Sequence, residues 1–315
     1  MDGTGDTLEM AENRPTPQGV LRHLRQELTG AMAAEVDAAA IVRYGSIVGS
    51  VIESHASLPR AMEYARSRIA ASAEANRAIA SGTVILADTM SRCKGRFSRS
   101  WHAPLGGVWG CMIFANTLLP QSRNFIPLAA GVACCEAVRE CGGAESRIRW
   151  VNDVLCGGRK LAGFLVEGYT EPVHGEEFAL VGFGINLNNT SFPAELADTA
   201  ISLRQVLDRE VDITGFTTIF LARLAWNFGL LYYEEARELS GESFSGRQGH
   251  HLLLDRWLNL SDTIGKQVVY GFDVMTAPQY QAEVLGLDAT GGLILRLADG
   301  FVKTEHSGEV RYRTT

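Results

Sequence analysis

Cationic side chains, a carboxylate and glycines follow one another in this chain in an order suited to holding a nucleotide phosphate beside an acyl group. The first segment, residues 91–107, carries Lys94, Arg96 and Arg99 among several glycines. Guanidinium and ammonium groups pair with phosphate oxygens, and glycine lets backbone amides approach the same anion. Alone, such a segment is also typical of a solvated basic turn. The segments that follow it therefore decide how it is interpreted.

Three further segments lie downstream in a fixed order. Residues 149–153 read Arg-Trp-Val-Asn-Asp, Lys160 comes seven residues after Asp153, and residues 182–186 read Gly-Phe-Gly-Ile-Asn. A strand that ends in Trp-x-Asn-Asp is also explained by a capped turn. The Gly-x-Gly pair lacks the third glycine and the following helix of a dinucleotide fingerprint, so a Rossmann interpretation is poor. The ordered set is far more specific than any one motif.

In this order the segments resemble the motifs of biotin protein ligases. Residues 91–107 resemble the family's adenylate loop, GRGRxGRxWxSPxGG, and residues 149–153 resemble its KWPND motif. Residues 160–167 match KxxGxLxE, residues 182–186 match GxGxN, and residues 307–313 resemble the GEVxxR ending. The last segment alone is equally typical of a charged edge hairpin.

The resemblance implies a role for individual residues. In the family the loop orders over the acyl-adenylate, a role that falls to Arg96, and the lysine that matches Lys160 contacts both the reacting carboxylate and the α-phosphate. Asp153 and Asn186 are implied as ligands of the Mg²⁺ that accompanies ATP. The other residues implied to bind substrate or adenylate are Ser57, Met90, Lys94, Gly95, Arg99, Trp101, Gly106, Gly107, Trp150, Asn152, Asp153, Gly163, Leu165, Gly182, Gly184, Asn186, Glu309 and Arg313.

The activity that the resemblance implies is a two-step ligation. Biotin reacts with Mg-ATP to give biotinyl-AMP, and a lysine of a biotin carboxyl carrier domain then accepts the biotinyl group. ATP and Mg²⁺ would be co-substrates, biotin a substrate, and no tightly bound cofactor is expected. The expected partner is that carrier domain, and a homodimer is left open.

The chain departs from the family where the acid's head group would bind. The Ser-Thr-Asn signature before the first helix is missing from residues 53–61, and Met90 stands where a Gln often helps bind biotin. Each lost hydrogen-bond partner of the ureido ring would cost about 0.5–1.5 kcal/mol. Two alternatives follow. One is a relative that handles lipoate or octanoate, and the other is a non-catalytic regulator that binds biotin or adenylate.

Composition limits the class of protein. The 315 residues are 46% hydrophobic and carry a net charge of −7, so no nucleic acid or anionic membrane surface is expected as a partner. Residues 1–17 have neither the charged nor the apolar region of a signal peptide, and no run of about 18 apolar residues occurs. The six cysteines form no C-x-x-C pair and are predicted to be reduced thiols. We expect a cytoplasmic protein.

The elements predicted around these motifs form an α+β fold. Strands that cluster after the first helices favour a mixed sheet with flanking helices rather than a doubly wound one. We expect a disordered tail and short helical arm over residues 1–40, a catalytic domain over 41–260 and a small C-terminal domain over 261–315. Short strands and the turn at residues 288–292 predict a β-barrel there, SH3-like according to the resemblance.

Overall fold

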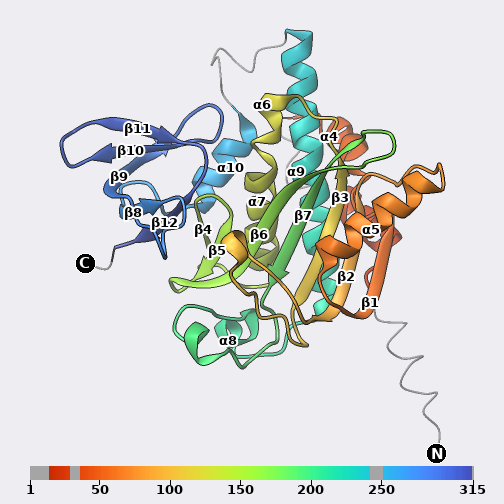
Figure 1. The fold of residues 1–315 in the computed structure, drawn as a ribbon, viewed down its shortest axis with the longest axis horizontal. Helices are drawn as coiled ribbons and strands as arrows, with labels where there is room; N and C mark the ends of the chain where they lie inside the picture. The colour runs from red at the N-terminus through yellow and green to blue at the C-terminus, as the bar shows by residue number, and fades with distance from the viewer. Residues whose placement is uncertain (1–13, 29–35, 242–250, 314–315) are drawn as a thin grey trace, which may run out of the picture.

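The structure, a computed structural model, describes residues 14–28, 36–241 and 251–313 (Figure 1). Its centre is a seven-stranded sheet in the order β1-β2-β3-β7-β6-β5-β4. Only β1 and β2 run parallel, and all other neighbouring pairs are antiparallel. The strands are β1 Ile52–Leu58, β2 Thr83–Met90, β3 Val108–Ala115, β4 Arg147–Arg149, β5 Asp153–Cys156, β6 Arg159–Thr170 and β7 Glu177–Ile185.

Both faces of the sheet's centre are buried, which explains why β3 and β7 are almost continuously apolar. Helices α7 (Ile126–Glu140) and α9 (Ile213–Ser240) pack on one face, where Phe183 belongs to the main core. Helix α5 (Ala61–Glu74) covers part of the opposite face and packs on a smaller cluster (Figure 1). We call these the α9 face and the α5 face. The short helices in the connections between these elements are α6 Pro120–Arg123, α8 Leu203–Leu207, and the 3-10 turns η2 Arg96–Ser98 and η3 Ala194–Leu196.

The N-terminal segment packs against the main core. Helix α2 (Pro17–His23) lies inside the stretch predicted as a disordered tail and short helical arm, and it continues into a π-helical turn, η1 (Leu24–Leu28). Helix α4 (Ala38–Gly45) runs across the expected boundary at residue 40 and lies along α9. Residues 1–13 and 29–35 are outside the described residues, so the tail and the middle of the predicted arm are not tested. The described helices are anchored by buried Val20, Leu24 and Ile41.

The C-terminal part follows helix α10 (Leu252–Leu260) and is a five-stranded antiparallel sheet. The hairpin predicted around residues 288–292 is confirmed, because Asp288 N–H donates to the Gly292 carbonyl at 2.8 Å between β9 and β10. No pairing between β11 and β12, which would close a barrel, occurs among the described strands. The strands are β8 Gln267–Gly271, β9 Tyr280–Leu287, β10 Leu293–Leu297, β11 Val302–Glu305 and β12 Glu309–Tyr312.

The predicted α+β class, with a large mixed sheet, flanking helices and a C-terminal antiparallel sheet, is confirmed. All six cysteines are free thiols, as predicted. In the described part of the chain, no helix combines the length and apolar character that a bilayer crossing needs.

Helices α4 and α9 touch backbone to backbone through two glycines. A methyl group on Gly229 of α9 would lie 2.2 Å from the carbonyl oxygen of Ile41, and one on Gly45 of α4 would lie 2.0 Å from that of Ala225. Neither neighbour is a flexible side chain, so the contact cannot relax locally. This close approach fixes the N-terminal helices on the sheet's α9 face.

Gly229→Ala is expected to destabilise the protein by about 1–3 kcal/mol, because overpacking a fixed contact outweighs the better helix propensity of alanine. Urea denaturation followed by circular dichroism measures the effect. Gly168→Ala is the matched control, since a methyl group there meets nothing within 4 Å, and it should leave the midpoint nearly unchanged. Equal midpoints for Gly229→Ala and the parent would contradict the packing described for α4 and α9.

Candidate functional site

Three glycines leave a strip of the α5 face without side chains. Gly163 of β6 and Gly184 of β7 are register partners, and Gly182 pairs with Leu165 one step further along the same face. Alternate residues of a strand point to the same face. The Gly-x-Gly spacing in β7 therefore places the side-chain positions of Gly182 and Gly184 on this face. We call the strip over Gly163, Gly182 and Gly184 the glycine trough.

Side chains from two segments, the loop of residues 91–107 and the start of β6, lie over the glycine trough. A methyl group added to Gly184 would lie 2.5 Å from Nε1 of Trp101, and one added to Gly163 would lie 2.8 Å from Nζ of Lys160. The ammonium of Lys160 is 5.4 Å from the centre of the Trp101 ring. The indole N–H of Trp101 is buried and has no hydrogen-bond partner among the described residues. The trough therefore carries a cation and an unused donor.

A carboxylate between two cations fixes the Lys160 end of the trough. Asp153 accepts from Lys160 Nζ at 2.6 Å and from Arg149 Nη2 at 2.7 Å. Arg149 and Asp153 face each other across β4 and β5, and Lys160 lies at the start of β6, so the sheet brings all three together. Burial alone would raise the pKa of Asp153, but the two cations outweigh it and lower the pKa to about 2. The carboxylate is ionised at any physiological pH.

The loop of residues 91–107, which resembles the family's adenylate loop, is held against the C-terminal sheet. Arg96 Nη1 donates to the carbonyl oxygen of Gly308 at 2.6 Å, and Arg99 forms an ion pair with Glu309. The ring of Phe97 packs on Phe272, with centroids 5.1 Å apart. Inside the loop, Gly95 N–H donates to the carbonyl oxygen of Arg99 at 2.7 Å and closes a tight turn. Arg96, Arg99 and Glu309, which the sequence predicts to act together, are brought together.

The end of this loop meets the segment after β7. Gly106 has φ +98°, a conformation that favours glycine, and its carbonyl accepts from Asn188 N–H at 2.6 Å. Gly107 leads into β3 against Trp109, whose ring would lie 2.0 Å from an added methyl group. Gly106 is thus favoured by its backbone conformation and Gly107 by the close approach of the Trp109 ring. Lys94 is exposed, and its backbone forms a bridge to Ser100 within the loop.

Asp153 and Asn186, the predicted Mg²⁺ ligands, are both engaged with other side chains in this structure. Both carboxylate oxygens of Asp153 already accept from cations. Asn186 is buried, and its side-chain oxygen accepts from Asn189 at 3.0 Å. No cluster of three or more His, Cys, Asp or Glu side chains with metal-binding geometry occurs in the described ranges. We therefore derive no step through a metal held by these two residues.

Four other predicted binding residues differ in burial and in the contacts they make. Trp150 is buried and its indole N–H donates to the carbonyl oxygen of Gly291 at 3.2 Å, which indicates a packing role. Asn152 is buried against α7, where it touches Gly131. Ser57 is an exposed residue on the edge strand β1. Arg313, at the end of the described chain, is also exposed.

Met90 supports the start of helix α5. Its sulfur accepts from the N–H of Ala61 at 3.3 Å, at the first residue of α5. Arg60, the N-cap residue, provides no side-chain cap, so the thioether takes its place. Met90 thereby positions the helix that borders the trough.

The sequence analysis did not single out the polar cluster at the other end of the trough. Arg60 and Arg66 of the α5 region both reach Glu167 of β6. Met62, also from α5, lies over Gly182, since a methyl group there would be 2.7 Å from its sulfur. The available signal was Glu167, the last residue of the KxxGxLxE match. Its partners are about a hundred positions away, which no local pattern reveals.

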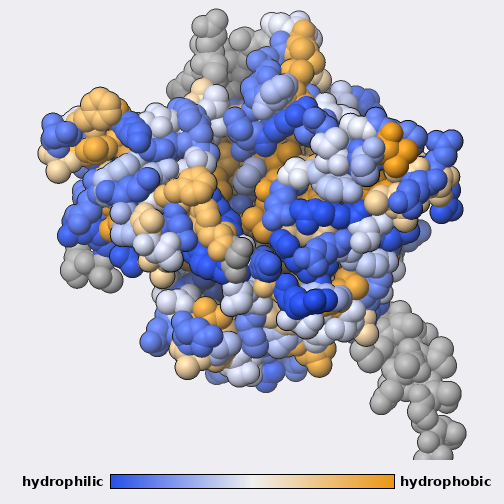
Figure 2. Space-filling view, viewed as in Figure 1, coloured by the Kyte–Doolittle hydropathy of each residue, from blue (hydrophilic) through white to orange (hydrophobic). Residues whose placement is uncertain are grey.

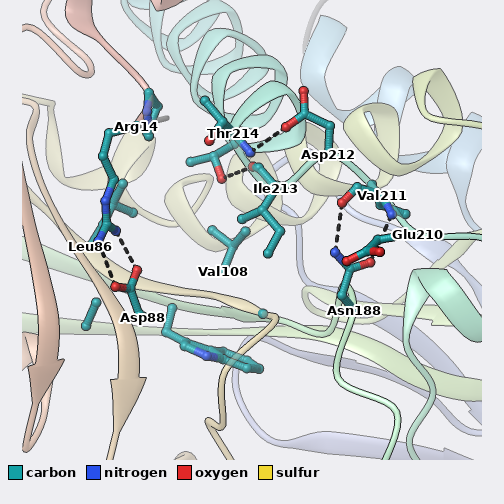
Figure 3. A pocket seen from close by; sticks show the side chains of 15 residues that line it. Arg14, Leu86, Asp88, Val108, Asn188, Glu210, Val211, Asp212, Ile213 and Thr214 are labelled. Atoms are coloured by element: carbon teal, nitrogen blue, oxygen red, sulfur yellow. Dashed lines mark hydrogen bonds and ion pairs between the residues drawn. The ribbon is translucent and has the colours of Figure 1, made fainter. Parts of the chain in front are cut away.

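A cavity of about 790 Å³ opens on the α9 face. Figure 3 shows Asp88 of β2 pointing into it and paired with Arg14, while Asp212 caps the start of α9. Leu86 and Val108 in its wall belong to the main core. Gly107 and Trp109, which also line the cavity, adjoin the loop of residues 91–107, and Trp109 packs in one cluster with Trp101.

Comparison with known proteins agrees with this geometry. Residues 66–186 match the Biotin/lipoate A/B protein ligase family. The bifunctional ligase/repressor BirA of Bacillus subtilis is 35% identical over 144 residues, which are 45% of this chain and 44% of that protein. Its counterpart in Bacillus spizizenii is 28% identical over 233 residues, 73% of this chain and 66% of that protein. The matched part thus spans less than two thirds of either relative.

A solved structure shows the same fold over most of the chain. Biotin protein ligase from Aquifex aeolicus, in complex with biotin and ATP, superposes with a TM-score of 0.64 at 21% identity. The match covers 84% of this chain and 99% of that one. At this level of identity the likeness concerns the fold.

Asp153→Asn is expected to destabilise the protein by about 2 kcal/mol at neutral pH, the equivalent of a pKa lowered from 3.8 to about 2. Because the folded-state pKa is depressed, this stabilisation is full above about pH 4 and is lost as the pH falls towards 2. Urea unfolding at pH 7 and pH 3 should show a smaller difference from the parent at pH 3. Glu145→Gln, whose side chain is 85% exposed, is the control. A difference that does not change with pH would contradict the assigned ion pairs.

Proposed function

We propose that this chain, which carries a domain of the biotin/lipoate A/B protein ligase family in residues 66–186, is an ATP-dependent biotin protein ligase. The observation that carries the proposal is a strip of three glycines that lies beneath the Trp101 indole and ends at a fixed ammonium group. The glycines leave room for an apolar acyl arm along this strip, and the carboxylate at the end of the arm meets Lys160. Asp153, the carboxylate that holds Lys160, also pairs with Arg149. A protein that only bound an acid would not need this second cation.

In the first step the acid's carboxylate oxygen attacks the α-phosphate of ATP, an O–P bond forms, and pyrophosphate leaves. Lys160 lies where it can contact both the attacking carboxylate and the α-phosphate, so it offsets the negative charge that gathers as they approach. Asp153 holds the ammonium in place and keeps it from folding onto other acceptors. The unused indole N–H of Trp101 offers a further donor to the ligand over the trough.

In the second step the ε-amine of a lysine on a carrier domain attacks the acyl carbon, an amide forms, and AMP leaves. Before that step the acyl-adenylate must stay bound and shielded from water. Residues 91–107 can close over it, because Arg96 and Arg99 reach across to the C-terminal sheet and hold the loop down. We assign Arg96 to retention of the adenylate.

The carrier domain as partner, a cytoplasmic location and the division into units at residues 40 and 260 stay predictions. The relatives named as ligases support the carrier, since one of them is the biotin–[acetyl-CoA-carboxylase] ligase of Mycobacterium tuberculosis, 32% identical over 127 residues. A homodimer also stays open.

A competition experiment tests the proposal and both alternatives. The protein is given ATP, equal concentrations of biotin, lipoate and octanoate, and a mixture of apo carrier domains. We expect mass spectrometry to find a biotinyl adduct on one carrier lysine. A lipoyl or octanoyl adduct would identify a lipoate-type relative, and no pyrophosphate with any acid would identify a non-catalytic binding protein.

Lys160→Ala should lower the rate of biotin-dependent pyrophosphate release on the order of a hundredfold or more, as expected when one preorganised donor is removed. The side chain is 32% exposed and contributes charge rather than packing, so the circular dichroism spectrum should not change. Lys303→Ala, on strand β11, is the matched control and should keep the parent rate. Parent-like release from Lys160→Ala would remove Lys160 from the mechanism.

A further inference from the structure

The end of the glycine trough opposite Lys160 is polar. Gly163, Leu165 and Glu167 alternate along β6 and therefore point to the same face. At the rise of a β-strand, Glu167 lies about 13 Å beyond Gly163. A carboxylic acid whose carboxylate meets Lys160 and whose arm follows the trough thus directs its far end towards Glu167.

Arg60 brings a guanidinium to this end. Its Nη2 is 3.3 Å from Oε1 of Glu167 and 3.9 Å from the sulfur of Met62, which itself lies over Gly182. Arg60 is the last residue before α5 and only 12% of its side chain is exposed. The guanidinium therefore borders the trough and is largely shielded from solvent.

The charges around Arg60 leave it able to bind a further acceptor. Its ion-pair partners are Glu167 at 3.3 Å and Glu63 at 3.5 Å, both longer than a strong charge-assisted hydrogen bond. Glu167 is shared with Arg66, which pairs with its other oxygen. A guanidinium has five N–H donors, and a carboxylate has about four acceptor positions. Both groups of the Arg60 and Glu167 pair therefore keep hydrogen-bonding capacity.

We propose that Arg60 and Glu167 recognise the head group of the acid, and that this head group is a planar one that both accepts and donates hydrogen bonds, as a cyclic urea does. Arg60 donates to the carbonyl oxygen of the urea, and Glu167 accepts from one of its N–H groups. The inference rests on the proposed function, because it assumes that an acid lies in the trough with its carboxylate at Lys160.

This pair accounts for the absence of the expected polar signature before α5. Arg60 comes from that segment, so the chain provides a different donor at the same end of the trough. The pair also sets specificity, because an alkyl chain or a dithiolane ring can neither accept from Arg60 nor donate to Glu167 and therefore gains no hydrogen bond there. Met62 can make room for the head group, since an unbranched thioether adopts several conformations at little cost.

Binding and turnover of two Arg60 variants test the pair. Arg60→Ala should weaken the affinity for biotin and for dethiobiotin, which keeps the urea, about ten- to a hundredfold in titration calorimetry. The dissociation constants for octanoate and lipoate should not rise. At saturating biotin the rate of pyrophosphate release should stay near that of the parent, so that KM changes and kcat does not. Arg60→Gln keeps a neutral N–H donor and should lose less.

Arg68→Ala is the matched control, because Arg68 lies on the same helix, pairs with Glu53 and is 42% exposed. It should bind biotin as the parent does, and circular dichroism should show all three variants folded. If Arg60→Ala does not fold, the biotin affinity of Arg60→Gln alone tests the inference. Parent-like biotin affinity in a folded Arg60 variant overturns the inference while leaving the proposed ligase intact. A parent protein that binds no urea-containing acid overturns it as well, and absence of pyrophosphate release from the parent refutes the proposed function separately.

Discussion

The ion pair between Asp153 and Lys160 is the interaction on which the site depends. An ammonium group at the end of an apolar trough would otherwise turn to solvent, and a carboxylate in the same place would otherwise be protonated or unpaired. Arg149 supplies the second positive charge, so the cluster carries a net positive charge beside the place where an anionic acid would arrive. The sheet fixes the geometry, since the three residues come from three neighbouring strands.

Contacts from the C-terminal part of the chain hold the segment that carries Arg149 and Asp153 in place. Trp257 of α10 donates to the carbonyl oxygen of Val151 at 3.0 Å, and Trp150 donates to that of Gly291. The guanidinium of Arg149 lies 6.0 Å from the ring centre of Tyr312 on β12. The strand bearing Arg149 is short and lies at the edge of the sheet, where few ladder hydrogen bonds hold it. Contacts from α10 and the C-terminal sheet compensate for this.

The motifs, the glycine spacing and the strands that bear them could be predicted from the sequence because each is a local pattern. Gly182 and Gly184 share a face through simple alternation, and Asp153 precedes Lys160 by the length of a hairpin. What could not be predicted depends on pairs far apart in the chain. The approach of Gly229 to Ile41 and that of Arg60 to Glu167 are set by how helices dock on the sheet. Trp150 belongs to a local motif, but its hydrogen bond to the carbonyl oxygen of Gly291, 141 positions away, is another such long-range pair.

The loop of residues 91–107 connects the glycine trough to the C-terminal sheet. Trp101, at its end, lies over Gly184, while Arg96 and Arg99, a few residues earlier, are bound to the C-terminal sheet. A displacement of that sheet would therefore move the loop's cations and the indole together. The C-terminal sheet also contacts Arg149. It therefore holds both the loop that covers the acid and one of the two cations that pair with Asp153. Because the trough floor belongs to the central sheet, the depth of the site depends on how closely the C-terminal sheet packs against it.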